Sequence, residues 1–330
     1  MLLSDFLTPD LFASAIRIAT PLALAAIAGA ICERSGVVNI ALEGIMLIGA
    51  FAGVVITLAM EASKVPFLVD NAVWFGVLAA VLAGTALSAI HAFASVTLRM
   101  DQIVSGTALN ILALGLTGFL LEVIYGHAGA TNSVVHQLQP LFDFPAVQGA
   151  GFWSDVWYWI DQLVFSYTPI VYMAMIAAVI GQWAMFRTRW GLRLRALGEH
   201  PRAADTVGVR IIRGRYMAVL MSGALGGLGG AYLSLEQNSS FSENMTSGRG
   251  FIALAANIFG RWTPIGSYLA SLLFGFAEAL EIKMQGFRDV FQIPTQFFLM
   301  LPYVLTVVVL AGFMGRAVGP AEVGKPYEKE

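Results

Sequence analysis

Charged residues and cysteine are scarce in this sequence. Of its 330 residues only 12% are Asp, Glu, Lys or Arg, whereas 58% are hydrophobic, and the mean hydropathy is +0.74. In a soluble globular chain about twice that share of residues is charged, so the composition excludes a soluble globular protein. It predicts a protein embedded in membrane lipid. The single cysteine, Cys32, excludes an internal disulfide and is expected to be a small apolar helix residue.

The motifs of common catalytic sites are also missing. The chain has no G-x-x-x-x-G-K-[ST] phosphate loop and no G-x-S-x-G nucleophile elbow. Its four histidines show no paired metal-ligand spacing, and its acidic residues are too scattered to form a catalytic carboxylate pair. We therefore expect no catalytic residue, no metal and no cofactor in this chain, and nothing in the sequence points to a nucleic-acid partner.

Long apolar runs account for most of the chain. A spanning helix needs about 20 mostly apolar residues. Eight such runs lie at 12–32, 39–60, 72–97, 103–125, 169–186, 216–235, 264–281 and 297–314. A ninth run at 251–260 is too short to cross unaided, and we interpret it as a half-helix or a short buried span. The predicted fold class is an all-α polytopic membrane protein with about nine transmembrane segments, forming one transmembrane domain over residues 1–330.

Basic residues are distributed unevenly between the loops. Eight arginines lie in 187–215, and the tail carries Arg316, Lys325 and Lys329, whereas the loop 126–168 contains no Lys or Arg. The positive-inside bias therefore places 187–215 and the C-terminus in the cytoplasm, and 126–168 and the N-terminus outside. No basic residue occurs among the first ten residues, so we expect no cleaved signal peptide. The expected location is the cytoplasmic (inner) membrane, with several passes.

The loop 126–168 contains a cluster of aromatic residues, F-W-S-D-V-W-Y-W-I-D-Q-L at 152–163. Aromatic rings on a short amphipathic segment are typical of a helix that lies at the membrane interface. The alternative is that the rings line the entrance for a ligand.

A short sequence pattern occurs twice. Residues 35–42 and 247–254 share S-G-x-x-x-I-A-L. The first copy starts on the cytoplasmic side and the second on the outside, as an inverted repeat requires. We therefore predict two inverted half-repeats, about 12–125 and 216–314, with the substrate path between them.

Polar side chains in or beside the apolar runs are candidates for the translocation path, because such residues are costly in lipid and usually face an interior. The candidates are Asn39, Glu43, Asn110 and Asn257. For the last three, two roles stay open here, namely hydrogen bonding between helices and lining a polar path. Glu33 and Arg34, at the end of the first run, are expected to pair with each other or with lipid headgroups.

Glycine recurs in the run 216–235 at a spacing of four residues. Gly223 with Gly227 and Gly226 with Gly230 form small-xxx-small pairs. Such pairs let helices approach closely, so we favour a packing role for these glycines over direct contact with a substrate.

The loop 187–215 contains a signal for a short helix. Gly198 and Pro201 bracket a break, Pro201 suits the first turn of a helix, and Gly208 suits its end. We predict a short helix over 201–208 that docks onto a soluble partner. The alternative is a solvated basic loop that only sets the orientation of the chain.

Four stretches resemble the membrane permeases of bacterial ABC importers. They are E-R-S-G-V-V-N-I-A-L-E-G-I-M-L-I-G-A-F at 33–51, G-E-H-P-R-A-A-D-T-V-G-V at 198–209, S-G-A-L-G-G-L-G-G-A at 222–231 and G-R-G-F-I-A-L-A-A-N-I-F-G-R-W-T-P-I-G at 248–266. The branch that they resemble is that of simple-sugar, branched-chain amino-acid and nucleoside permeases. The first stretch and the tail P-A-E-V-G-K-P-Y-E-K at 320–329 look most like the purine-nucleoside importers.

The resemblance implies a subunit without ATPase activity that works with other chains. These are a second permease of similar fold, cytoplasmic subunits that bind ATP and Mg, and an extracytoplasmic substrate-binding lipoprotein. The coupling helix, which contacts the ATPase in such importers, carries over to Gly198, Pro201, Arg202, Ala203, Ala204 and Gly208. Arg202 stands where the E-A-A-x-x-x-G loop of another importer class has Glu, which leaves open the partner residues that it meets.

The expected function is ATP-driven translocation of a nucleoside, a purine nucleoside in particular, by alternating access. One alternative is a ribose-like simple-sugar permease of the same kind. A second, from a different class, is an ion-coupled secondary transporter, since such proteins also use inverted repeats and broken helices.

Overall fold

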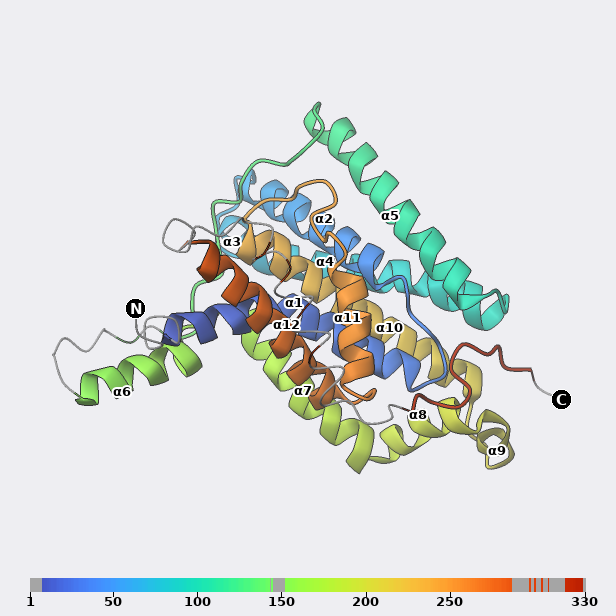
Figure 1. Ribbon diagram of the computed structural model, residues 1–330. Coiled ribbons are helices and arrows are strands. Elements are labelled where there is room, and N and C mark those ends of the chain that lie inside the picture. Colours follow the sequence, from blue (N-terminus) through green and yellow to red (C-terminus); the bar gives the residue numbers. More distant parts are fainter. Residues whose placement is uncertain are drawn as a thin grey trace.

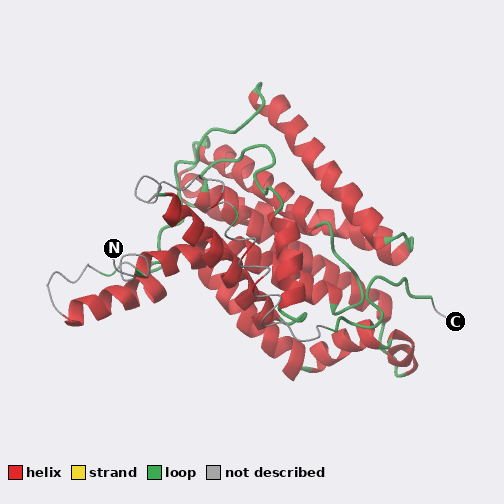
Figure 2. Ribbon diagram, in the orientation of Figure 1, coloured by secondary structure: helices red, strands yellow, loops and turns green. Residues whose placement is uncertain are grey.

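A computed structural model describes residues 8–142, 144, 152–286 and 318–328, together with residues 297, 300, 304 and 308. Over this part of the chain the structure consists of helices and loops, without any strand, as Figure 2 shows. The predicted all-α architecture is therefore confirmed for the described residues. The helices are α1 (Pro9–Glu33), α2 (Leu42–Glu61), α3 (Pro66–Asp70), α4 (Ala72–Ala92), α5 (Gln102–Tyr125), α6 (Phe152–Ile160), α7 (Pro169–Arg187), α8 (Arg189–Glu199), α9 (Pro201–Thr206), α10 (Ile211–Ala231), α11 (Arg249–Phe259) and α12 (Pro264–Gln285), with π-helical turns at Phe93–Thr97, Asp161–Phe165 and Tyr232–Gln237.

Seven of these helices are long and apolar enough to cross a membrane. They are α1, α2, α5, α7 and α12, and α4 and α10 each with the π-helical turn that follows. They coincide with seven of the eight long apolar runs in the sequence. The short run at 251–260 falls in α11, which has 11 residues. The run 297–314 lies almost entirely outside the described residues, so the total of nine segments stays a prediction, as do the inverted repeats.

α1 lies at the centre of the helices. It packs against α12, α10, α11 and α7, and every residue from Ala19 to Glu33 is buried (Figure 1). A helix surrounded in this way needs an apolar surface on all sides, which explains the absence of a single apolar stripe in its sequence. α10 packs on α4 and α2, whereas α5 contacts mainly α2 and leaves most of its surface exposed.

Local sequence signals set the starts of several helices. α1, α3, α7, α9 and α12 each have proline in the first turn, where its fixed φ and missing N–H fit a helix. The Asp101 carboxylate caps α5 by accepting from Ile103 N at 2.8 Å and Val104 N at 2.9 Å. These signals are local, which is why the sequence alone places the helices well.

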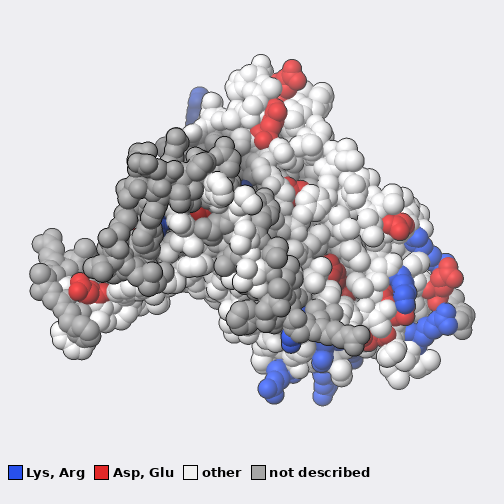
Figure 3. All heavy atoms as spheres, viewed as in Figure 1, with Lys and Arg blue, Asp and Glu red and all other residues white. Residues whose placement is uncertain are grey.

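The two ends of the molecule differ in composition. The aromatic segment of the loop 126–168 forms the short helix α6, which lies near the start of α1, whereas α8, α9 and the segment 318–328 lie at the other end (Figure 1). Lys and Arg gather over that second end, as Figure 3 shows. The uneven charge of the sequence is therefore also uneven in space.

Candidate functional site

The connection between α1 and α2, residues 34–41, is non-helical and largely buried. Side chains from other helices bind its backbone groups. Val38 N donates to Gln102 Oε1 at 2.7 Å, and His91 Nε2 lies 2.9 Å from Val38 O. Non-helical backbone at membrane depth is stable only where protein groups pair with it. We call this connection the α1–α2 joint. Its backbone is held by side chains of α4 and α5.

Two candidates for the translocation path, Asn39 and Asn110, make hydrogen bonds at this joint. Asn110 on α5 donates from Nδ2 to Ile40 O at 3.0 Å and accepts Gly44 N at 2.8 Å through Oδ1. Asn39 donates from Nδ2 to Ser222 Oγ on α10 at 2.9 Å. Both amides thus tie the joint and the start of α2 to neighbouring helices.

Glu43 binds the first turn of α11. Its Oε1 accepts Gly248 N at 2.7 Å, and its Oε2 accepts Gly250 N at 2.6 Å. The Glu43 side chain is buried. A carboxylate is favoured at this position because free backbone N–H groups and the helix dipole give the N-terminus of a helix a partial positive charge.

The opposite end of α11 is held by the end of α1. Asn257 Nδ2 donates to Glu33 Oε2 at 3.2 Å, and Trp262 Nε1 also donates to that oxygen. Arg34 Nε donates to Trp262 O at 2.9 Å. Of the two roles expected for Glu33 and Arg34, pairing with each other is wrong, because Glu33 binds Asn257 of α11 and Trp262, and Arg34 binds the carbonyls that follow α11. Their contact with lipid headgroups stays a prediction. Burial lowers the pKa of the Arg34 guanidinium, and the carboxylate of Glu199, 3.5 Å away, opposes that shift.

These contacts hold α11 between two fixed points of the α1–α2 region. Its positive end meets the Glu43 carboxylate, and carbonyls beyond its negative end meet the Arg34 guanidinium. Asn39, Glu43, Asn110 and Asn257 all make hydrogen bonds between separate elements in this conformation. A role of the same residues in lining a path stays a prediction.

The four glycines of α10 face two different helices. A Cβ at Gly223 would lie 2.6 Å from Gly84 O on α4, and one at Gly227 would collide with Ala80 O. On the other face, a Cβ at Gly226 would lie 2.8 Å from Ile45 Cγ2 on α2, and one at Gly230 would collide with Met46 O. Gly223, Gly227 and Gly230 thus lie against the backbone of a neighbouring helix, and Gly226 lies against the Ile45 side chain.

The predicted coupling residues lie on α8, α9 and the turn after α9. Pro201 starts α9, which ends at Thr206, and Gly208 follows with a φ of 83°. Pro201, Ala204 and Gly198 are buried; a Cβ at Gly198 would lie 2.5 Å from Arg34 O in the α1–α2 joint. The remaining three residues, Arg202, Ala203 and Gly208, are exposed. One side of this segment therefore contacts the core and the other is open to a partner.

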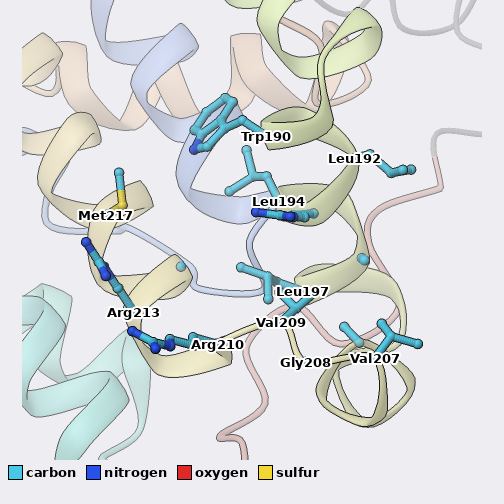
Figure 4. A pocket seen from close by; sticks show the side chains of 14 residues that line it. Trp190, Leu192, Leu194, Leu197, Val207, Gly208, Val209, Arg210, Arg213 and Met217 are labelled. Carbon is cyan, nitrogen blue, oxygen red and sulfur yellow. The ribbon is translucent and has the colours of Figure 1, made fainter.

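A groove of about 640 Å³ lies between α8 and α10, beside the end of α9. Figure 4 shows Leu194 and Leu197 on one wall and Arg210 and Arg213 on the other. Among the residues that the structure describes, the lining has three arginines, including Arg193, and no acidic residue. The groove therefore fits apolar or acidic side chains of a docking protein better than basic side chains.

Sequence reasoning did not single out several residues that build these contacts. His91, Gln102 and Arg215 are buried polar residues that bind the α1–α2 joint or the chain terminus. The available signal was their position, within an apolar run for His91 and directly before one for Gln102 and Arg215, since buried polar groups need partners. Among the described residues, no group of three or more His, Cys, Asp or Glu could hold a metal ion.

Comparisons with known proteins identify the family of the chain. It is 44% identical to the guanosine ABC transporter permease protein NupQ of Bacillus subtilis and 40% identical to the nucleoside ABC transporter permease protein NupC of Lactococcus lactis, with 94% of each chain covered in both cases. It is 26% identical to the guanosine ABC transporter permease protein NupP of Bacillus subtilis, covering 82% of this chain and 73% of that one. No solved structure gives a significant match. Residues 11–310 match the family model of the branched-chain amino acid transport system permease component, and the chain belongs to that family.

Proposed function

We propose that this chain is the membrane-spanning subunit of an ATP-driven importer that carries a nucleoside, most specifically a purine nucleoside, into the cell. The observation that carries the proposal is the identity of 44% and 40% to two permeases named for guanosine and nucleoside transport, over 94% of each chain. Family membership and seven membrane-crossing helices are consistent with a permease subunit, whose ATP hydrolysis belongs to a separate chain.

The importer would contain several partners. A second permease of similar fold pairs with this one, a pairing consistent with the presence of two guanosine permeases, NupP and NupQ, among the relatives. Cytoplasmic ATPase subunits bind ATP and Mg, and an extracytoplasmic binding protein delivers the substrate. Selectivity then resides mainly in the binding protein, so the path through the permease requires only low affinity.

Coupling to ATP would begin at α9. The exposed Arg202 and Ala203 contact the ATPase, and closure of the ATPase moves α9 together with Gly198. Because Gly198 packs on the α1–α2 joint, the motion reaches Arg34 and Glu43, which hold the two ends of α11. The close-packed α10 carries the same motion to α2 and α4.

The substrate is tested by uptake of radiolabelled guanosine into cells that contain the complete importer. We expect uptake to disappear when this chain is deleted, and to be competed by other purine nucleosides but not by ribose or glucose. Competition by the sugars alone would establish the sugar permease instead. Uptake that survives loss of the ATPase subunit and stops on collapse of the ion gradient would establish the ion-coupled transporter.

A further inference from the structure

The C-terminal segment 318–328 lies across the cytoplasmic end of the helices. Two backbone hydrogen bonds fix its middle part. Glu322 N donates to Gly198 O at 2.8 Å, and Gly324 N donates to Gly36 O at 3.1 Å. The segment, which we name the C-terminal strap, therefore joins the end of α8 to the α1–α2 joint.

A buried arginine anchors the strap to α10. Arg215 is only 1% exposed, and its Nη1 donates to Lys325 O at 2.9 Å. A buried guanidinium is costly unless its donors are paired, so removal of the strap would leave this charge without that acceptor. The strap thus supplies a hydrogen-bond acceptor for a buried charge in addition to packing on the helices.

The last residues of the strap contact α9 and Arg99, which follows the π-helical turn after α4. Tyr327 Oη donates to Asp205 Oδ2 on α9 at 3.0 Å. Arg99 Nη1 lies 3.0 Å from Glu328 Oε1. A six-residue helix such as α9 has little stability of its own, so contacts of this kind decide where it lies.

α9 and the strap together enclose a second hollow, of about 630 Å³. Arg202 and Ala203 lie on the α9 side, and Glu322, Tyr327 and Glu328 lie on the strap side. The hollow therefore presents basic and acidic groups from two separate parts of the chain, side by side. A protein that docks on α9 would also meet the strap.

We propose that the ATPase docks on a composite surface made of α9 and the C-terminal strap, and that Tyr327 is a positioning residue for α9. This inference rests on the proposed function, because it assigns a second part of the chain to the coupling of ATP hydrolysis. The strap links α9 to α10 through Arg215 and to the α1–α2 joint through Gly36. A displacement of α9 therefore reaches both elements through the strap as well as through α8.

The test uses the complete importer in proteoliposomes and the substitution Tyr327→Phe, which removes one hydroxyl. Nucleoside uptake per ATP hydrolysed is expected to fall about three- to tenfold, the range for loss of one ordinary intramolecular hydrogen bond, while the permease keeps its thermal stability. Tyr158→Phe is the matched control, because Tyr158 Oη also donates to an aspartate, Asp10 Oδ1, at 2.8 Å but at the other end of the molecule. Tyr158→Phe is expected to leave the ratio unchanged.

Further variants separate the two levels of the proposal. Asp205→Ala is expected to lower the ratio at least as far as Tyr327→Phe does, and the double variant is expected to be no worse than Asp205→Ala alone. Ala203→Arg, on the exposed side of α9, is expected to abolish uptake and co-purification of the ATPase. If Ala203→Arg is disruptive but Tyr327→Phe is silent, the strap proposal fails and coupling through α9 stands. If Ala203→Arg is also silent, the coupling function itself is refuted.

Discussion

At the scale of single residues, Glu43 shows how one carboxylate connects distant parts of the chain. It is the second residue of α2, yet its oxygens accept two amides of residues 248 and 250, more than 200 positions later. The contact is both a cap and a charge at the positive end of a helix dipole. Because the site is buried, water cannot replace the carboxylate.

Replacement of Glu43 tests this structural role. Glu43→Ala leaves the buried Gly250 amide and the partly buried Gly248 amide without this acceptor, at about 1 to 3 kcal/mol for a buried group, and is expected to lower the thermal midpoint of the purified permease. Glu43→Gln keeps an acceptor oxygen and should have a smaller effect. Glu122→Ala, at an exposed position on α5, serves as the control and should change nothing. Normal stability of Glu43→Ala with a raised KM for nucleoside uptake would instead assign Glu43 to the translocation path.

At the scale of elements, α10 organises the packing of the helices around it. Two faces of this helix carry glycine, one against α4 and the other against α2. Small residues on both faces allow backbone contact on both sides, which supplies van der Waals attraction where no hydrophobic effect acts between helices in lipid. α10 also carries Arg215, so it links the close-packed region with the end of the molecule that holds α8, α9 and the strap.

Enlarging one glycine of α10 should disrupt this packing. Gly230→Val places side-chain atoms against Met46 O, and its Cβ would lie 2.7 Å from Ala50 N on α2. Overpacking of this kind costs about 1 to 3 kcal/mol or more, so we expect less monodisperse permease after extraction in detergent, measured by size-exclusion chromatography. The control is Gly118→Val on α5, where a Cβ meets no atom within 4 Å. Equal yields of the two variants would show that α10 tolerates separation from α2.

At the scale of the whole molecule, the chain has two chemically different ends. The end with α8, α9 and the strap carries most of the arginines, whereas the loop that leads to α6 has neither Lys nor Arg. In a membrane this asymmetry favours one orientation, with the basic end in the cytoplasm. That orientation is also the one that would place α9 beside an ATPase.

The orientation is testable with a thiol reagent that does not cross membranes. The natural Cys32 is buried, so it gives little background. Val135→Cys, at a position that is 80% exposed in the loop 126–168, should react in intact cells. Ala203→Cys on α9 should react only after the cells are permeabilised. The opposite pattern would place the arginine-rich loop outside and would contradict the proposed contact with a cytoplasmic ATPase.

Much of the fold was predictable because its signals are local. Apolar runs of membrane length, prolines at helix starts and the one-sided charge located seven membrane-crossing helices, the short α11 and the start of α9. One of the two roles expected for Glu33 and Arg34, a pair with each other, was wrong for the same reason. Adjacency in sequence favoured a local pair, but Glu33 binds Asn257 and Trp262. Arg34 binds backbone carbonyls at 261 and 262 and lies 3.5 Å from Glu199, and no local pattern indicates any of these partners.

The sequence by itself determined the class of this protein. Hydropathy, charge and four family-like stretches specify an all-α permease, because each depends on neighbouring residues alone. Only the tertiary structure decided that Glu43 and Arg34 hold α11, and that the strap joins α9 to Arg215. These contacts join residues 110 to 228 positions apart, and no local pattern specifies them. Burial creates them, since each polar group withdrawn from water must find a partner within the fold.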